Sequence, residues 1–229
     1  TVRERKLEAE SLIDYAEGDL NFNMRQCLKA LPYFEKVKNN PAVRDSNFVQ
    51  MLVLKRMMEC YDAIYDEDNM IETTLQLRKK AHAIGNKAFE AMTYFMSGKW
   101  HHRNGQKEIG YSSCLEAVEE MKESDYPFKH VELRVFYLEL LRMYTRDGRF
   151  DDALRMSKLQ ETEAIQPSPA LIRNARDRGL REVYALRASV LARAGRMAEA
   201  DKAYAAWQKT TSANVIDDMN IFDYLQLSH

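Results

Sequence analysis

The sequence predicts an all-α protein, built as an α-α superhelix of about five helical hairpins followed by a C-terminal helix. A six-residue pattern, Gly148–Ala153, recurs as Gly195–Ala200, more loosely as Gly105–Gly110, and with other end residues as Arg25–Ala30 and Asp68–Thr73. A glycine that closes one helix, followed by a helix whose small residue allows close packing, is typical of stacked hairpin arrays. The low content of glycine and proline, 8 and 5 of 229 residues, also favours helix.

The recurring pattern and the apolar periodicity place the elements in order. We expect hairpins at residues 5–40, 45–85, 87–123, 127–166 and 169–210, and a terminal helix at 214–227 in one helical repeat domain covering 1–229. In the first hairpin, one helix starts near Leu7 and carries Leu12, Ile13, Ala16 and Leu20 on one face. It ends either at Gly18 or at Met24, and we favour Met24 because a partner stripe then begins at Cys27.

Local signals mark the later boundaries. Asp45 or Ser46 can cap the helix that opens the second hairpin, and Gly85 is placed to end that hairpin. Asn104-Gly105 is a strong turn signal within the third. Gln166–Pro169 is the clearest break in the chain, with Ser168 as a cap and Pro169 as the first helical residue of a long helix.

Composition limits the possible functions. A formal net charge of −1 gives no concentrated basic surface, so we do not expect nucleic acid as a partner. No run of about 18 apolar residues is present, so we expect no membrane insertion by this segment. Cys27, Cys60 and Cys114 are widely spaced and are expected to be buried, reduced thiols.

The hairpins resemble tetratricopeptide repeats. The residues that carry this resemblance are Gly98, Gly105, Gly110 and Ala117 in the third hairpin, Leu140, Tyr144, Gly148, Phe150 and Ala153 in the fourth, and Ala188, Leu191, Gly195, Ala200 and Tyr204 in the fifth. The first two hairpins depart from the pattern, with Arg25 and Asp68 where the turn glycine belongs and Thr73 in place of the small residue. The intervals of 43, 37, 43 and 47 residues also exceed the usual repeat of about 34.

By overall likeness, the chain resembles the extracytoplasmic repeat region of sensor histidine kinases and related regulators from Bacteroidetes. This resemblance implies a sensory or regulatory module of a signal-transduction protein, located in the periplasm, with the cytoplasm as the alternative compartment. A chain beginning at Thr1 is consistent with a trimmed segment of a longer protein. The alternatives are a constitutive scaffold, or an accessory subunit of a periplasmic or cell-surface assembly. A helical bundle without superhelical stacking is the alternative fold.

In repeats of this kind the first helix of each hairpin lines a concave groove, where a protein or peptide partner would bind. The groove residues implied by this phase are Tyr65, Phe95, Lys99, His102, Arg103, Leu138, Arg142, Arg146 and Arg193. Five of them are cations, which suit a carboxylate or an acidic segment of the partner. The alternative is that these cations solvate exposed helix faces and pair with nearby acids. The pattern lacks the Lys and Asn arrangement of the carboxylate clamp that binds chaperone tails.

No catalytic pattern is present in the sequence. His101 and His102 are adjacent, so on a helix they point about 100° apart and do not readily hold one metal ion. No glycine-rich phosphate loop, HExxH motif or nucleophile elbow occurs. We therefore expect a non-catalytic binding module without a cofactor or metal, whose oligomeric state the sequence leaves open.

Overall fold

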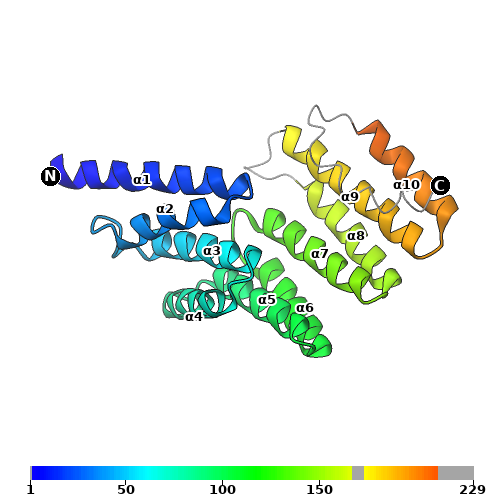
Figure 1. Ribbon diagram of the computed structural model, residues 1–229, viewed down its shortest axis with the longest axis horizontal. Helices are drawn as coiled ribbons and strands as arrows, with labels where there is room; N and C mark the ends of the chain where they lie inside the picture. The colour runs from blue at the N-terminus through cyan, green and yellow to red at the C-terminus, as the bar shows by residue number, and fades with distance from the viewer. Residues whose placement is uncertain (1, 167–172, 211–229) are drawn as a thin grey trace. The chain divides into compact units, whose positions relative to one another are not determined.

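The computed structural model describes residues 2–166 and 173–210, and within them the chain is helical, with short turns and no strand (Figure 1). The helices, in chain order, are α1 (Val2–Asn23), α2 (Cys27–Asn39), α3 (Asn47–Ala63), α4 (Glu67–Ala83), α5 (Lys87–Arg103), α6 (Lys107–Glu123), α7 (Lys129–Arg146), α8 (Phe150–Ala164), α9 (Arg173–Arg193) and α10 (Met197–Lys209). Their order confirms the all-α class and the five predicted hairpins. The predicted break at Ser168 and Pro169 and the predicted helix at 214–227 lie outside the described residues.

Six of the turns between the described helices share one geometry. Arg25, Tyr65, Gly85, Gly105, Gly148 and Gly195 all have positive φ, between 58° and 82°. At most of these turns the following amide donates back to a carbonyl five residues earlier, as in Asp66 to Tyr61 at 3.0 Å and Arg149 to Tyr144 at 2.9 Å. This is the Schellman arrangement, which satisfies the last carbonyls of a helix and ends it.

The register predicted for the second turn is wrong by three residues. Tyr65, not Asp68, has the left-handed conformation that glycine adopts in the later turns. With Tyr65 in that place, the intervals from Arg25 to Tyr65 and from Tyr65 to Gly105 are both 40 residues. The correction also makes Met70 the equivalent of Ala153, instead of Thr73. The sequence did not indicate Tyr65 because residues with a Cβ rarely adopt the left-handed conformation, so a tyrosine is not expected to end a helix in this way.

The sixth position of the corrected pattern is buried in every hairpin. Ala30, Ala153 and Ala200 have no exposed surface, and Gly110 and Met70 are also buried. A small side chain here lets a neighbouring helix pack closely, which is why the pattern carried structural information. Helix starts follow local rules as well, because the side chains of Ser46, Asp66 and Asn86 accept bonds from first-turn amides. Ser46, rather than Asp45, is the cap of α3.

Helix α1 continues past Gly18 to Asn23, as predicted. Gly18 lies against the ring of Phe34 on α2, and an added Cβ would come within 2.7 Å of that ring. The face of α1 that packs is, however, not the one that its leucine pattern suggests. Ser11 and Gly18 are buried, whereas Leu12, Ile13 and Leu20 are 72%, 63% and 55% exposed.

The chain divides into two compact units, Thr1–Asn104 and Gly105–His229. In the N-terminal unit α1 packs on α2, α2 on α3, α3 on α4 and α4 on α5; in the C-terminal unit α6 packs on α7, α7 on α8, α8 on α9 and α9 on α10. Each unit has its own apolar cluster, around Phe34 in the first and Leu191 in the second. The single repeat domain over 1–229 remains a prediction.

Two sequence expectations concern the whole chain. Cys27, Cys60 and Cys114 are buried and form no disulfide with one another, which confirms the expected buried, reduced thiols. A search of the described residues finds no helix with the length and hydropathy that a membrane span requires.

Candidate functional site

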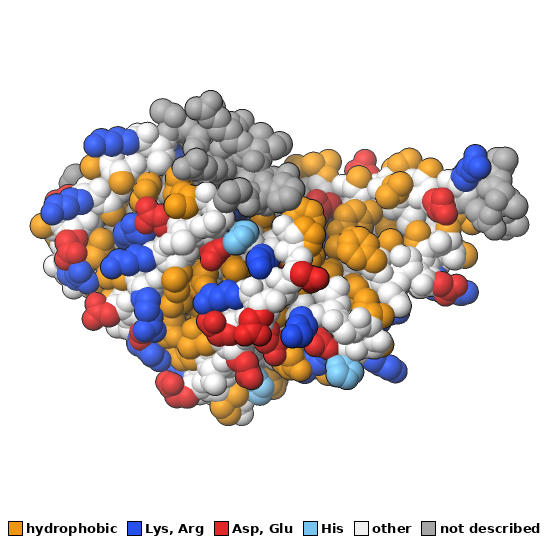
Figure 2. All heavy atoms as spheres, turned by 180° about the vertical axis from the view of Figure 1, so that it is seen from behind, with side chains coloured by type: hydrophobic (Ala, Val, Ile, Leu, Met, Phe, Trp, Pro, Cys, Tyr) orange, Lys and Arg blue, Asp and Glu red, His pale blue; other side chains and the backbone are white. Residues whose placement is uncertain are grey.

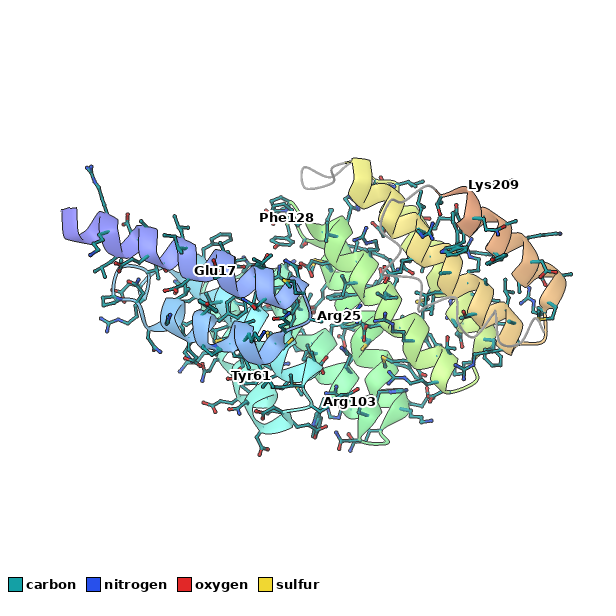
Figure 3. All side chains as sticks on the ribbon, turned by 45° about the horizontal axis from the view of Figure 1, so that its top comes forward. Glu17, Arg25, Tyr61, Arg103, Phe128 and Lys209 are labelled. Atoms are coloured by element: carbon teal, nitrogen blue, oxygen red, sulfur yellow. The ribbon has the colours of Figure 1, made fainter. Side chains whose placement is uncertain are left out.

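In the N-terminal unit, two of the predicted groove cations converge on one carboxylate. Lys99 Nζ lies 2.7 Å from Asp62 Oδ2, and Arg103 Nη1 lies 2.5 Å from Asp62 Oδ1. The Arg103 guanidinium, labelled in Figure 3, also lies 6.0 Å from the ring centroid of Tyr65, which is 76% exposed. Because Asp62 is on α3 and both cations are on α5, this cluster ties the two helices together.

Two other predicted groove residues of α5 have little accessible surface. Phe95 is 4% exposed and His102 is 7% exposed. A side chain buried to this degree does not contact a partner without rearrangement, so neither belongs to a surface for ligands. The predicted helix boundaries placed both residues correctly on α5. The helical period did not show which side of α5 is exposed and which side faces neighbouring helices.

In the C-terminal unit, the predicted groove cations are more accessible. Arg146 and Arg193 are exposed, and Leu138 is half-buried. Arg142 Nη1 lies 2.7 Å from Glu139 Oε1, one turn earlier on α7, with its side chain 37% exposed. This set therefore offers positive charge on α7 and α9, partly offset by Glu139.

A pocket of about 350 Å³ lies in the C-terminal unit, on α8, α9 and α10, where the sequence predicted no site. Its lining consists of Asp151, Leu154, Arg155, Lys158, Arg187, Leu191, Arg196 and Glu199. Two leucines give it an apolar floor, since Leu191 is buried and Leu154 is half-buried. Figure 2 shows Lys and Arg side chains interspersed with hydrophobic ones on the C-terminal unit, on the left of that view.

The positions of two arginines in this pocket are set by hydrogen bonds. Arg187 on α9 donates from Nε to Ser157 Oγ at 2.9 Å and from Nη2 to Glu161 Oε2 at 2.7 Å, so it bridges α9 and α8. Arg196, in the turn before α10, donates from Nε and Nη2 to the two oxygens of Glu199, both at 2.7 Å. The hydrogen bond from Arg196 lowers the pKa of Glu199 below its ordinary value.

The remaining charges of the pocket are held more loosely. Arg155 pairs with Asp152 at 2.8 Å, and Arg196 reaches Asp151 at 3.3 Å. Asp151 is 99% exposed, and an ion pair so fully solvated contributes little. Lys158 is exposed and has no ion pair within the described part of the chain. The pocket thus combines an apolar floor with cations able to receive a carboxylate.

Sequence reasoning missed this pocket because it assigned binding to the first helix of each hairpin. Two of the three contributing helices, α8 and α10, are second helices. Arg155 and Lys158 stand three positions apart and therefore lie on one face of α8. That spacing, followed by Arg196 in the next turn, was a usable signal.

A smaller, mostly apolar pocket of about 190 Å³ lies between α4 and α5. Trp100 and Leu75 are among its lining residues. The Trp100 indole donates to Glu67 Oε2 at 3.3 Å, and Arg78 Nη2 donates to Ser97 Oγ at 2.8 Å, so polar pairs join the two helices. Neither pocket contains a nucleophile held by a base, and no cluster of metal-ligating side chains occurs among the residues that the structure describes.

Hairpins with Schellman turns, four of the five described ones with a small buried residue in the second helix, define this chain as an all-α protein with tetratricopeptide-like helical hairpins. No protein-family model matches the sequence, and no curated protein matches it. The crystal structure of MamA protein is similar at 15% sequence identity and a TM-score of 0.47, over 88% of this chain and 91% of the MamA chain. At that identity and TM-score, the likeness carries no argument about function.

Proposed function

We propose that this chain is a non-catalytic binding module that recognises an acidic segment of a partner protein in the α8–α10 pocket. The observation that carries the proposal is the combination in one pocket of Leu154 and Leu191 with four cations, one of which, Lys158, has no carboxylate partner among the described residues. A volume of about 350 Å³ accommodates one or two side chains of a peptide.

The geometry assigns a role to each part of the pocket. An apolar peptide side chain would contact the leucine floor, while a neighbouring carboxylate would accept hydrogen bonds from Lys158 and Arg155. Arg187 is already held by Ser157 and Glu161, so its position needs no further ordering, and its charge is balanced by Glu161. Asp151 and Glu199 are the unfavourable elements, because their carboxylates would repel the ligand.

The test compares two charge-reversal variants of matched size. Binding of a labelled peptide of alternating Leu and Glu residues is measured by fluorescence anisotropy, against a scrambled peptide with Gln in place of Glu. We expect Arg155→Glu/Lys158→Glu to weaken binding at least about tenfold, since two charge-assisted contacts are lost and replaced by repulsion. Arg142→Glu/Arg146→Glu, on α7, should change affinity only slightly and should lose that effect in high salt.

Each other outcome has a defined meaning. If the α7 variant loses binding and the pocket variant does not, the ligand binds the originally predicted groove residues and the pocket assignment is wrong. Equal binding by wild type and both variants would overturn the proposal of an acidic ligand. Asp151→Asn gives an independent check, because removing the repelling carboxylate should tighten binding severalfold.

The resemblance to sensor histidine kinase repeat regions is the basis for the further hypothesis that this module regulates a signalling domain. In that case peptide binding should alter amide hydrogen exchange in helices remote from the pocket. A constitutive scaffold or accessory subunit would show protection at the pocket alone. Sequencing the gene beyond the codon for His229 provides a second test, since a sensor would continue into a hydrophobic span and a kinase domain.

A further inference from the structure

The pocket between α4 and α5, two helices labelled in Figure 1, is a second cavity with the features of a binding site. Ile71 and Leu75 line it from α4, and Trp100 lines it from α5. Leu75 is 56% exposed, so the apolar wall of this α4–α5 pocket reaches the surface of the N-terminal unit. A volume of about 190 Å³ is below that of a site for a drug-sized ligand and fits one bulky side chain.

The polar groups of the lining are already hydrogen-bonded within the N-terminal unit. The Thr74 hydroxyl donates to the carbonyl of Met70 at 2.7 Å, and the Ser97 hydroxyl donates to the carbonyl of Thr93 at 3.0 Å. The Trp100 indole donates to Glu67 Oε2 at 3.3 Å. The cavity therefore offers a ligand mainly apolar surface, and an apolar side chain would fill it without leaving these groups unpaired.

The two ends of the α4–α5 pocket carry opposite charges, and the positive end is occupied. Arg78 lies one turn after Thr74 and is half-buried. Its Nε donates to Thr93 Oγ1 at 3.1 Å and its Nη2 donates to Ser97 Oγ at 2.8 Å. Its guanidinium also lies 4.5 Å from the ring centroid of Tyr94. Arg78 thus joins α4 to α5, and little of it remains for a ligand.

The negative end is open to solvent. Glu67 contacts the pocket through Trp100, and Asp68 and Glu72 are exposed. Within residues 2–166 and 173–210, none of these three carboxylates forms an ion pair. Asp68, Glu72 and Leu75 follow one another at four and three residues, so they share one side of α4. The helix dipole accounts for acids in the first turn, but not for Glu72 beside an exposed leucine.

We propose that the α4–α5 pocket binds a segment of a partner protein in which a bulky apolar side chain is next to a lysine or arginine. The apolar side chain would lie between Leu75 and Trp100, while the cation would pair with Glu67 and Asp68. The Trp100 ring adds attraction for a cation. This site is separate from the proposed function, because the α8–α10 pocket lies in the other unit and selects the opposite charge.

The first experiment uses Trp100 as a reporter of pocket occupancy. The chain has two tryptophans, so Trp207→Phe leaves Trp100 as the only one. A short peptide with one Leu flanked by two Lys residues should change its fluorescence saturably, with a dissociation constant on the order of 0.1–1 mM. Peptides with Ser in place of Leu, or Gln in place of Lys, should bind at least about fivefold more weakly.

The second experiment repeats the titration with variants of the pocket. Leu75→Ser should weaken binding about tenfold, because it removes an apolar wall. Glu67→Gln/Asp68→Asn keeps an acceptor for the Trp100 indole but removes two charges. It should weaken binding about three- to tenfold at low salt, and the difference from wild type should disappear at high salt.

Matched controls on other helices separate these effects from general changes of the surface. Leu28→Ser, at a 72% exposed position on α2, and Glu8→Gln/Glu10→Gln, at exposed positions on α1, should bind the lysine peptide as wild type does. Circular dichroism and thermal unfolding check that each variant keeps the helices of the wild type.

Three outcomes overturn the proposal. The first is no saturable binding, either by fluorescence or by calorimetry of the same titration. The second is binding that neither pocket variant weakens, which would place the peptide on another surface. The third is equal affinity for the lysine and glutamine peptides, which would exclude a cation as part of the ligand.

The proposal and the proposed function fail separately. Arg155→Glu/Lys158→Glu, in the α8–α10 pocket, should bind the lysine peptide with unchanged affinity. Leu75→Ser should likewise bind the acidic peptide as wild type does. Loss of both peptides in either variant would show that the two pockets are not independent, and would overturn the assignment of a separate site.

Discussion

Two turns of this protein hold a residue with a side chain where the others hold glycine. Tyr65 and Arg25 have φ of 59° and 58°, in the left-handed region that costs a non-glycine residue about 1 kcal/mol. Tyr65 is 76% exposed and contacts the Arg103 guanidinium, so its ring contributes little burial in return. The turn is therefore maintained by its Schellman hydrogen bonds and by the packing of α3 and α4.

We predict that Tyr65→Gly stabilises the protein by roughly 0.5–1 kcal/mol, because glycine adopts this conformation without a Cβ penalty. Gly105→Ala is the matched control in the opposite direction. No atom lies within 4 Å of the Cβ it would add, so its expected loss of about 1 kcal/mol reports conformation alone. Urea unfolding checks both, and a destabilised Tyr65→Gly would show that the tyrosine ring contributes more than its conformation costs.

Glu59 gives a prediction about pH. Burial disfavours its charged form, but Lys55 at 3.2 Å and Arg56 at 3.0 Å outweigh burial, so the pKa of Glu59 lies below its ordinary value. A carboxylate whose pKa is lower in the folded than in the unfolded protein stabilises the fold. This stabilisation is fully present above the unfolded-state pKa of about 4.3 and is lost as the pH falls through the folded-state pKa.

Glu59→Gln should therefore cost about 1–2 kcal/mol at neutral pH, because Lys55 loses the carboxylate that lies 3.2 Å away, whereas Arg56 keeps its contact with Asp19 at 2.8 Å. The difference from wild type should narrow as the pH is lowered below about 4, where wild-type Glu59 becomes protonated. Glu72→Gln, at an exposed position on α4, should change neither the stability nor its slope with pH. A constant difference across the acid range would show that Glu59 acts through packing and not through charge.

At the scale of helices, the approach of α1 to α2 depends on Gly18. Its Cβ-less backbone lies against the buried ring of Phe34. In an isolated helix alanine would be favoured over glycine by about 1 kcal/mol, but here the added methyl would come within 2.7 Å of the ring. We expect the clash to dominate.

Gly18→Ala is thus predicted to destabilise the protein by about 1–2 kcal/mol, through overpacking between α1 and α2. The double variant Gly18→Ala/Phe34→Leu provides the control, because a smaller side chain at position 34 should make room for the methyl. Thermal unfolding of the four proteins gives the coupling energy, and additive effects would contradict the contact.

The helices themselves were largely predictable from the sequence. Apolar periodicity and the turn residues predicted five hairpins, because both signals depend on residues a few positions apart within one element. Asp68 was a wrong choice because the true turn residue, Tyr65, has no sequence mark of a left-handed conformation. The sequence grouped Leu12, Ile13, Ala16 and Leu20 on one face of α1, but periodicity detects an apolar face without revealing whether a neighbour covers it.

At the scale of the whole chain, a destabilising mutation is expected to act mainly within the compact unit that contains it. The apolar cluster around Phe34 belongs to the N-terminal unit and the one around Leu191 belongs to the C-terminal unit. Arrays of this kind behave as coupled repeats, in which a loss in one region does not spread fully to distant ones.

We predict that Phe34→Ala, which removes a fully buried ring at a cost of about 3–5 kcal/mol, raises hydrogen exchange mainly in residues 5–104. Leu191→Ala, at a buried position of α9, should raise exchange mainly in the described helices after Gly105. Mass spectrometry of peptic fragments distinguishes the units. Uniform acceleration over both units in either variant would show one cooperative domain, which is the single-domain alternative from the sequence.

The sequence by itself determined the number, order and approximate ends of the helices, since turn geometry, capping and apolar spacing are local. Only the tertiary structure decided which residues are accessible. Asp62 meets Lys99 and Arg103 from 37 and 41 residues away, Phe95 and His102 are buried, and the α8–α10 pocket forms from three helices. Exposure and charge pairing depend on contacts between elements that the helical period does not encode, so the repeat phase located the helices but did not show which of their residues are accessible.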